Sequence, residues 1–310
     1  MPTEPCAILF PGQGAQFVGM GKDLAEAFPA AAEVFRRANE VVGFDLAALC
    51  FEGPEEALTS TANSQPAIYT VSFAVLEALK AENRLAAWDV KAAAGLSLGE
   101  LTALAFAGAM TFEEGLRLVR ERGRCMQAAA EANPGGMAAV IGLDEAAVTA
   151  VCEEAASAGV VAPANINSPE QIVVSGAVEA VEAASRLALE RGARSVVPLR
   201  VSAAFHSPLM RPARERFAEA LDGVTFGRPA VPVISNVTAE PHGDGAAIRA
   251  ALLDQIDHPV RWWPSMQRFL DDGVREFREV GPGRVLAGML KRIDRTATCT
   301  SIGTRAAVCG

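Results

Sequence analysis

A serine between two glycines is the first residue of this chain that could do chemistry. Ser97 lies in Gly95-Leu96-Ser97-Leu98-Gly99, after a short apolar run and before an Ala/Leu-rich segment with helical character. This is the layout of a nucleophile elbow, in which a sharp strand-to-helix turn exposes one hydroxyl group. The start of the helix would direct free N–H groups and a positive dipole end towards an oxyanion. The alternative is an ordinary Gly/Ser turn.

Three histidines could serve as the base for such a serine. His206 follows an apolar run and precedes Ser207-Pro208, which places it at a strand end near a turn, a usual place for catalytic groups on α/β sheets. His242 lies in a hydrophilic Pro-His-Gly-Asp-Gly turn and is expected to be exposed, and His258 immediately precedes a proline. A lone histidine is more often structural than catalytic, but a serine nucleophile needs a base, and His206 is the best placed.

A buried arginine is expected on the helix predicted over residues 111–130, for which Thr111 is a plausible N-cap. At about 100° per residue, Arg122 falls towards the buried flank, whereas the other arginines of this helix lie on the opposite face. A guanidinium group there could form an ion pair at the edge of the core or bind a carboxylate bidentately. The residues alone favour the ion pair.

The first glycine-rich loop, Pro11-Gly12-Gln13-Gly14-Ala15-Gln16, connects a short apolar strand to a predicted helix. A dinucleotide-binding loop would need a third glycine where Phe17 stands, and a phosphate-binding loop would need a lysine where Met20 stands. Both interpretations therefore fail. What remains is a tight connection or one half of an oxyanion hole, and the loop alone favours the tight connection.

The pattern of predicted elements changes from Gly136 onward and follows the order β-α-β-β-α-β up to Val201. This is the split β-α-β pattern of a ferredoxin-like unit. We therefore predict an α/β fold with two parts: an α/β-hydrolase-like subdomain with a parallel sheet, formed by residues 1–130 and 202–310, and an inserted ferredoxin-like subdomain, residues 131–201. Elsewhere, Pro66 is expected to interrupt a helix, residues 231–236 are expected to form a strand, and the tail after Ala306 is expected to be unstructured.

Composition narrows the possible classes of protein. The chain has 310 residues, half of them hydrophobic, which is enough for a large core. Its formal net charge of −9 argues against a general nucleic-acid surface. The six cysteines show no metal-binding spacing and fit a reduced, cytoplasmic protein. Neither a secretion signal nor a membrane-spanning segment is indicated.

Seven sequence blocks, in order along the chain, resemble the malonyl-CoA:acyl-carrier-protein transacylases, the acyltransferase family of fatty-acid and polyketide synthesis. The blocks lie between about Ile8 and Ile302 and read Phe10-Pro11-Gly12-Gln13-Gly14-Ala15-Gln16, Gly95-Leu96-Ser97-Leu98-Gly99-Glu100, Arg120-Glu121-Arg122-Gly123-Arg124, Asn165-Ile166-Asn167-Ser168-Pro169, Phe205-His206-Ser207, Pro259-Val260-Arg261-Trp262 and Glu279-Val280-Gly281-Pro282-Gly283.

The resemblance implies a role for each candidate residue. Ser97 would be the acylated nucleophile and His206 its base. The histidine would be oriented by the backbone carbonyl group of Gln255 rather than by an acid, and the backbone N–H groups of Gln13 and Leu98 would form the oxyanion hole. Arg122 would bind the free carboxylate of malonate, in place of the ion pair favoured above.

Three further residues bear on the pocket. Asn167, from the inserted subdomain, would help to support the site. Phe205 resembles the residue of malonyl-preferring relatives and should crowd an α-methyl substituent, although a methyl-sized change is worth only about 1–3 kcal/mol of discrimination. Leu96 stands where many relatives carry histidine, which bears on the polarity of the pocket.

The predicted reaction is a ping-pong transfer. Malonyl-CoA acylates Ser97, and the phosphopantetheine thiol of an acyl carrier protein then accepts the malonyl group, without metal or bound cofactor. One alternative is a serine thioesterase or esterase, and another is a non-catalytic module that binds carrier proteins. Carrier proteins are acidic, so basic residues are candidates for docking, although each could equally belong to a solvated helix face. These residues are Arg186, Arg191, Arg194, Lys291 and Arg292.

Overall fold

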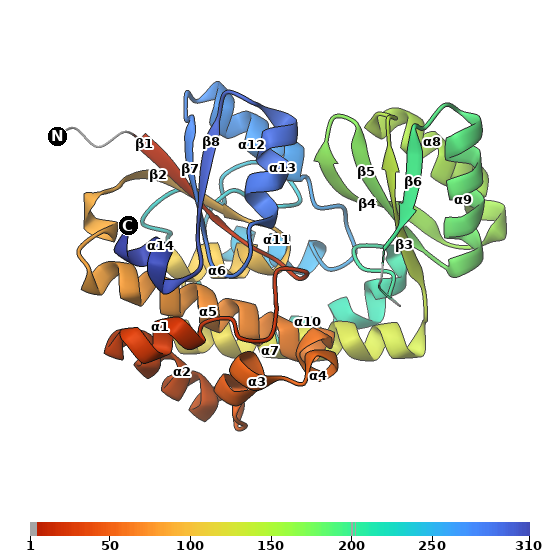
Figure 1. The fold of residues 1–310 in the computed structure, drawn as a ribbon. Helices are drawn as coiled ribbons and strands as arrows, with labels where there is room; N and C mark the ends of the chain where they lie inside the picture. Colours follow the sequence, from red (N-terminus) through yellow and green to blue (C-terminus); the bar gives the residue numbers. More distant parts are fainter. Residues whose placement is uncertain (1–4, 200, 202) are drawn as a thin grey trace.

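The computed structural model describes residues 5–199, 201 and 203–310, and these form two sheets with helices around them (Figure 1). The larger sheet is parallel and has the strand order β2-β1-β7-β8. Its strands are β1 (Pro5–Phe10), β2 (Asp89–Gly95), β7 (Glu276–Val280) and β8 (Thr298–Ile302). Phe10 and Gly95 are partners in the register of β1 and β2, so the loops that follow these strands leave the same edge of the sheet.

The smaller sheet is antiparallel and has the order β4-β5-β3-β6. Its elements, in chain order, are β3 (Gly136–Ile141), α8 (Glu145–Ala155), β4 (Val161–Ser168), β5 (Gln171–Gly176), α9 (Val178–Glu190) and β6 (Ser195–Pro198). This confirms the predicted β-α-β-β-α-β order, and a separate apolar core joins the sheet to its two helices. The exact division at residues 131 and 201 stays a prediction, and Ser202 and Arg200 lie outside the described residues.

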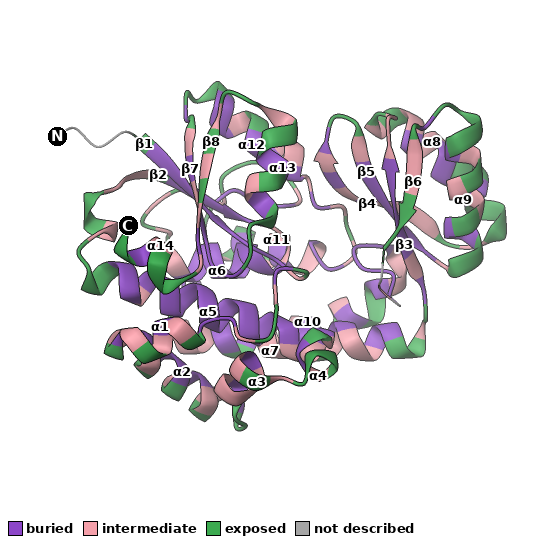
Figure 2. Ribbon diagram, in the orientation of Figure 1, coloured by how far each residue is buried: buried purple, intermediate pink, exposed green. Residues whose placement is uncertain are grey.

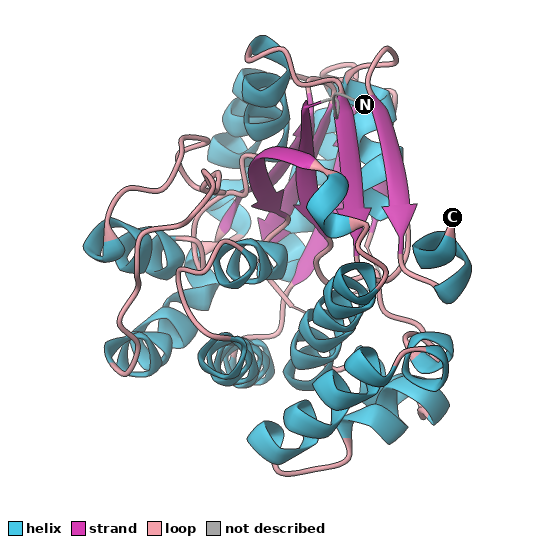
Figure 3. Ribbon diagram, turned by 90° about the vertical axis from the view of Figure 1, so that its left-hand side faces the viewer, coloured by secondary structure: helices cyan, strands magenta, loops and turns pink. Residues whose placement is uncertain are grey.

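Helices cover both faces of the parallel sheet (Figure 3). The helices described outside the smaller sheet are α1 (Lys22–Ala27), α2 (Pro29–Val42), α3 (Leu46–Glu52), α4 (Glu55–Thr59), α5 (Thr61–Ala81), α6 (Leu98–Phe106), α7 (Phe112–Ala132), α10 (Arg211–Asp222), α11 (Gly245–Asp254), α12 (Trp262–Asp271), α13 (Val285–Ile293) and α14 (Arg305–Cys309). Short 3₁₀ turns lie at Leu85–Ala87, Ala156–Ala158 and Pro208–Met210. Helix α5 is buried along most of its length (Figure 2). None of the described helices is long and apolar enough to cross a bilayer.

Helix α7 packs closely on α5, and two glycines make this possible. A Cβ atom on Gly115 would lie 2.1 Å from the Tyr69 hydroxyl oxygen, and one on Gly123 would lie 2.7 Å from the Thr61 carbonyl oxygen. Thr111 is the N-cap of this helix, as predicted, and forms a capping box with Glu114. The two glycines thus allow α7 to lie directly against the buried helix α5.

Three local predictions were wrong. Pro66 lies inside α5, because burial of the helix on several sides stabilises it despite the missing backbone donor. The tail forms α14, whose start is capped by Thr304 and whose Val308 is buried. The strand expected over residues 231–236 is reduced to two isolated bridges, between Val233 and Ala93 and between Ile234 and Pro241.

A segment of the larger part pairs through its backbone with the smaller sheet. Val260, which follows α11, donates its N–H to the Ala164 carbonyl oxygen at 2.9 Å, and its own carbonyl oxygen accepts from Ile166 at 2.9 Å. An ion pair of 3.0 Å between Arg261 and Glu145 lies next to this connection. A segment of the larger part therefore continues the edge of the smaller sheet along β4.

Candidate active site

Ser97 lies in a strained turn between β2 and α6. Its backbone angles, φ of 52° and ψ of −105°, fall outside the regions that residues other than glycine readily adopt, and this strain costs about 1–3 kcal/mol. The flanking glycines allow the turn to be this tight, since a Cβ atom on Gly95 would lie 1.9 Å from the carbonyl carbon of Gly99. One on Gly99 would lie 2.1 Å from the Phe10 oxygen. The geometry is that of a nucleophile elbow.

His206 lies beside the serine and is held from its other side. Its Nε2 is 2.8 Å from Ser97 Oγ, and its Nδ1 is 2.7 Å from the Gln255 carbonyl oxygen. Because a carbonyl oxygen only accepts, Nδ1 carries the hydrogen and Nε2 is left to accept from the serine hydroxyl. Burial and, secondly, the charge of Arg122 lower the pKa of His206 to about 4, against the opposing effect of the Gln255 carbonyl. The imidazole is therefore a neutral base at pH 7.

Arg122 is buried, with 1% of its surface exposed, and it touches the same hydroxyl group. Its Nη2 donates to Ser97 Oγ at 2.9 Å and to Gln255 Oε1 at 2.8 Å, while Nη1 donates to Gln65 Oε1 at 2.8 Å. Among the described residues it forms no ion pair, and its Nε has no partner. Burial lowers its pKa to about 10, which still leaves the guanidinium charged at neutral pH. A buried cation that contacts only neutral acceptors is suited to an anionic substrate group.

The first glycine loop lies against the elbow, as an oxyanion hole would require. A Cβ atom on Gly12 would lie 2.4 Å from the Leu96 carbonyl oxygen, so the loop backbone approaches the turn directly. The backbone N–H groups of Gln13 and Leu98 donate to no acceptor within the described part of the chain, and the Gln13 side chain donates to Thr61 Oγ1 at 3.3 Å. Leu98 is also the first residue of α6, where the helix dipole is positive.

The remaining predicted residues form none of these hydrogen bonds in the described part of the chain. Phe205 is 8% exposed and packs into the large apolar core next to His206. Asn167 lies on β4, and its Oδ1 is buried without a partner among the residues that the structure describes. Asn167 also forms no hydrogen bond with Ser97, His206 or Arg122 in that part of the chain. The structure thus groups Ser97, His206, Arg122 and Gln255, and leaves Asn167 outside the group.

Several polar residues beneath the elbow were not predicted from the sequence. Asn236 Oδ1 accepts from the Ser97 N–H at 2.6 Å, and Asn236 Nδ2 donates to the Gly95 oxygen at 2.8 Å, so one side chain fixes both sides of the turn. Glu100 is fully buried. The exposed position expected for His242 was wrong, since its side chain is 1% exposed and lies 2.7 Å from Glu100. Only the position of Glu100 three residues after Ser97 was a usable signal.

Comparisons with known proteins agree with this geometry. The family model described as "Acyl transferase domain" matches residues 8–307. The malonyl CoA-acyl carrier protein transacylase of Bacillus subtilis (strain 168) is 45% identical over 290 residues, which cover 93% of this chain and 90% of that protein.

Solved structures of other proteins also match this chain over nearly its whole length. The malonyl CoA-acyl carrier protein transacylase of Coxiella burnetii has a TM-score of 0.95 and 40% identity, over 99% of this chain and 96% of that one. A type II PKS acyl-carrier protein in complex with its malonyl-transacylase matches with a TM-score of 0.93 and 40% identity, over 99% of this chain and 98% of that one.

Proposed function

The chain belongs to the acyl transferase domain family, and we propose that it transfers a malonyl group from malonyl-CoA to the phosphopantetheine thiol of an acyl carrier protein through an ester on Ser97. One observation carries the mechanism: a single hydroxyl oxygen lies 2.8 Å from a neutral imidazole nitrogen and 2.9 Å from a guanidinium nitrogen. The first group can remove the proton, and the second can bind the carboxylate that distinguishes malonyl from acetyl groups.

Acylation follows from the hydrogen bonds described above. Ser97 Oγ attacks the thioester carbonyl carbon while its proton passes to His206 Nε2, and the Gln255 carbonyl oxygen keeps Nδ1–H in place. The oxyanion of the tetrahedral intermediate would be stabilised by the N–H groups of Gln13 and Leu98, a donor pair of which each member is typically worth about 10²–10³ in rate. The C–S bond then breaks, and the proton on Nε2 leaves with the sulfur of CoA.

Substrate preference would come from Arg122. The carboxylate of a malonyl group is only two bonds beyond the ester carbonyl carbon, so attachment to Ser97 keeps it close to the guanidinium group that already contacts Oγ. The buried position of Arg122 makes this charge-assisted interaction stronger than it would be in water. An acetyl group offers no anion to this cation.

In the second half of the reaction the thiol of the carrier protein replaces CoA. His206 Nε2 takes the thiol proton, the sulfur attacks the ester carbonyl carbon, and the proton returns to Ser97 Oγ as the C–O bond breaks. These steps use only side chains and the two substrates, so we propose that no metal or bound cofactor takes part. Transfer rates that survive dialysis against a chelator would support this, and loss of transfer restored by a metal would contradict it.

We propose that the carrier protein docks beside α13. Arg194, Lys291 and Arg292 line a groove of about 780 Å³ between α13 and the turn that joins β4 to β5. Arg186 and Arg191 do not line it. Arg191 pairs with Glu154, and Arg194 pairs with Glu170, which lines the same groove. Replacing Lys291 and Arg292 with glutamate should raise the KM for the carrier protein and weaken its dependence on salt concentration.

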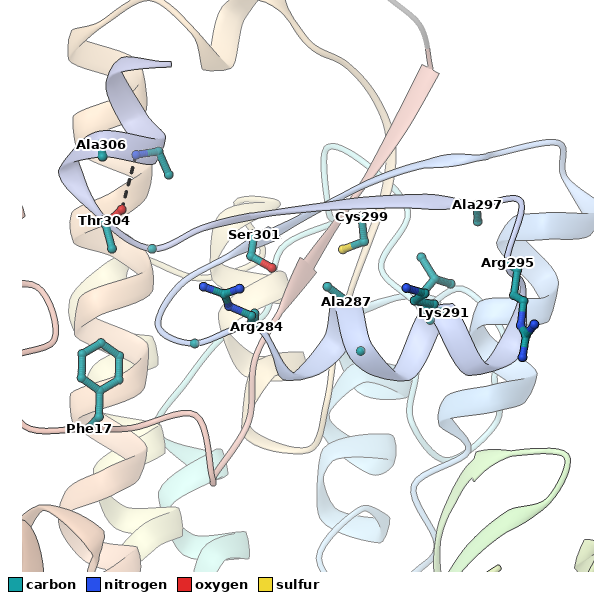
Figure 4. Close-up of a pocket in the computed structure, with 15 residues that line it drawn as sticks. Phe17, Arg284, Ala287, Lys291, Arg295, Ala297, Cys299, Ser301, Thr304 and Ala306 are labelled. Atoms are coloured by element: carbon teal, nitrogen blue, oxygen red, sulfur yellow. Dashed lines mark hydrogen bonds between the residues drawn. The ribbon is translucent and has the colours of Figure 1, made fainter. Parts of the chain in front are cut away.

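Positive charge continues around α13 into a second groove, of about 930 Å³. There Arg284, Lys291 and Arg295 follow one another along α13 and the turns at its ends, and Phe17 lies beyond the Arg284 end of this row (Figure 4). Neither of the two grooves is lined by Ser97, His206 or Arg122. The proposed docking surface is therefore separate from the site of chemistry, as expected when a flexible phosphopantetheine arm has to deliver the thiol.

Intact-mass measurement tests the proposed reaction. Protein mixed with malonyl-CoA should gain the mass of one malonyl group and lose it to added carrier protein, whereas Ser97→Ala protein should gain nothing. No mass gain in the unmodified protein would favour a non-catalytic carrier-binding module. Release of malonate to water at the same rate with and without carrier protein would favour a thioesterase.

We also propose a cytoplasmic location, supported by free thiols at all six cysteines and testable by cell fractionation.

A further inference from the structure

A second polar cluster lies directly beneath the site and contains a buried carboxylate. Both oxygens of Glu100 are occupied: Oε1 lies 2.7 Å from His242 Nε2, and Oε2 accepts from Gln255 Nε2 at 2.5 Å and from the Asn236 N–H at 3.1 Å. Glu100 is fully buried and the side chain of His242 is 1% exposed. Because a carboxylate oxygen accepts, His242 donates through Nε2.

This carboxylate sets the direction of one side-chain amide. The Gln255 amide group points its Nε2 towards Glu100 and towards the Ser97 carbonyl oxygen, which is 3.0 Å away. Its Oε1 is thereby directed to Arg122 Nη2 at 2.8 Å. If the amide were reversed, it would place an oxygen against the carboxylate and N–H groups against the guanidinium, both of which are repulsive. The buried carboxylate therefore determines which end of Gln255 faces Arg122.

Gln255 also acts through its backbone, since its carbonyl oxygen accepts from His206 Nδ1–H. One residue thus contacts the base through its main chain and the carboxylate-binding cation through its side chain. Whatever holds Gln255 in place controls the alignment of both groups with Ser97.

We propose that His242 and Glu100 form a positioning pair that acts on the reaction through Gln255, a role that rests on the proposed malonyl transfer. His242 occupies one oxygen of Glu100 and keeps the carboxylate from turning, so the other oxygen stays on Gln255. Neither residue touches the substrate. By holding Gln255 in place, they align His206 and keep Gln255 Oε1 directed at Arg122.

The test compares two replacements of His242 that differ by one methylene group. A glutamine amide nitrogen can take the place of histidine Nε2, whereas an asparagine nitrogen reaches only the place of Nδ1. His242→Gln should therefore load malonyl groups at nearly the normal single-turnover rate. His242→Asn should be slower by about 10- to 100-fold, as expected for a small displacement of reacting groups. The exposed His258, changed to glutamine and to asparagine, supplies the control pair.

Glu100→Gln is the second arm, and Glu279→Gln is its matched control. Both glutamates are fully buried, but Glu279 accepts from the N–H groups of Leu286 and Ala287 at the start of α13. Glu100→Gln should reduce the ratio of malonyl to acetyl loading, because Arg122 loses a fixed acceptor. Glu279→Gln should lower the unfolding temperature without changing that ratio. Rates are compared at equal folded fraction, measured by circular dichroism.

The outcomes separate the two proposals. Equal loading rates for His242→Gln and His242→Asn, together with an unchanged malonyl-to-acetyl ratio in Glu100→Gln, would overturn the positioning pair while leaving malonyl transfer intact. Absence of malonyl loading in the unmodified protein would instead overturn the reaction itself. A lower ratio in Glu100→Gln, with rescue by glutamine but not by asparagine at position 242, would support the pair.

Discussion

The base of this site should work at a pH at which an ordinary histidine is already protonated. Burial and the nearby charge of Arg122 lower the pKa of His206 to about 4. At pH 5.5 about nine-tenths or more of such a group is neutral, whereas only about one-tenth of a histidine with the usual pKa of about 6.5 is neutral. The rate of Ser97 acylation should therefore stay nearly constant from pH 8 to about pH 5 and fall below that.

Single-turnover acylation is the suitable assay, because it isolates the step in which His206 takes the serine proton. CoA release is followed by rapid mixing at pH values from 4 to 8, with protein that remains folded at each pH. A midpoint of the acidic limb near 6.5 would contradict this prediction, because it would show that the imidazole is not shielded as the structure indicates.

Replacing the cation separates the two causes of the shift. Arg122→Met removes the charge but keeps the burial, which is the larger cause, so the acidic limb measured with acetyl-CoA should move part of the way towards 6.5. In the unfolded chain His206 binds its proton at about pH 6.5, whereas in the folded chain it binds the proton only near pH 4. Below about pH 6.5 the contribution of His206 to the free energy of unfolding should therefore fall by about 1.4 kcal/mol per pH unit, until it levels off below pH 4. His206→Asn should remove this slope in urea titrations.

Four other substitutions test separate features. Arg122→Ala should lower malonyl loading by about 10- to 100-fold while acetyl loading is largely kept, and equal loss of both would contradict its proposed role. Gly99→Ala should strongly destabilise the protein, because its Cβ atom would lie 2.1 Å from a backbone oxygen. Gly288→Ala in α13, with no atom within 4 Å, should stabilise it by up to about 1 kcal/mol in thermal unfolding. Asn236→Ala should cost about 1–3 kcal/mol and slow acylation, since the Ser97 N–H loses its acceptor.

The parts of the site that depend on local pattern could be predicted from the sequence. The elbow around Ser97 is one such part, because the glycines that permit it are adjacent to the serine. The helix that carries Arg122 is another, because its periodicity shows which flank is buried. The contact between Arg122 and Ser97 could not be derived in this way. It depends on the close packing of α7 against α5, and the residues alone favoured an ion pair that the described chain does not form.

The features that could not be predicted from the sequence depend on tertiary structure. His242 lies in a turn of polar and small residues, and nothing nearby shows that its side chain turns inward to meet Glu100. Asn236 is separated from Ser97 by 139 positions, so their contact has no local signature. Pro66 does not interrupt a helix as propensity predicts, because propensity describes an isolated segment, whereas α5 is stabilised by its surroundings on several sides.

The backbone pairing of Val260 with β4 has a consequence for chimeric proteins. Val260 lies five positions after Gln255, whose carbonyl oxygen orients the imidazole, so the edge of the smaller sheet is anchored close to the base. Exchanging the smaller subdomain with that of a relative would therefore need a donor whose edge strand offers the same two backbone partners. A graft with a shifted register there would disturb proton transfer even if every side chain around Ser97 were left untouched.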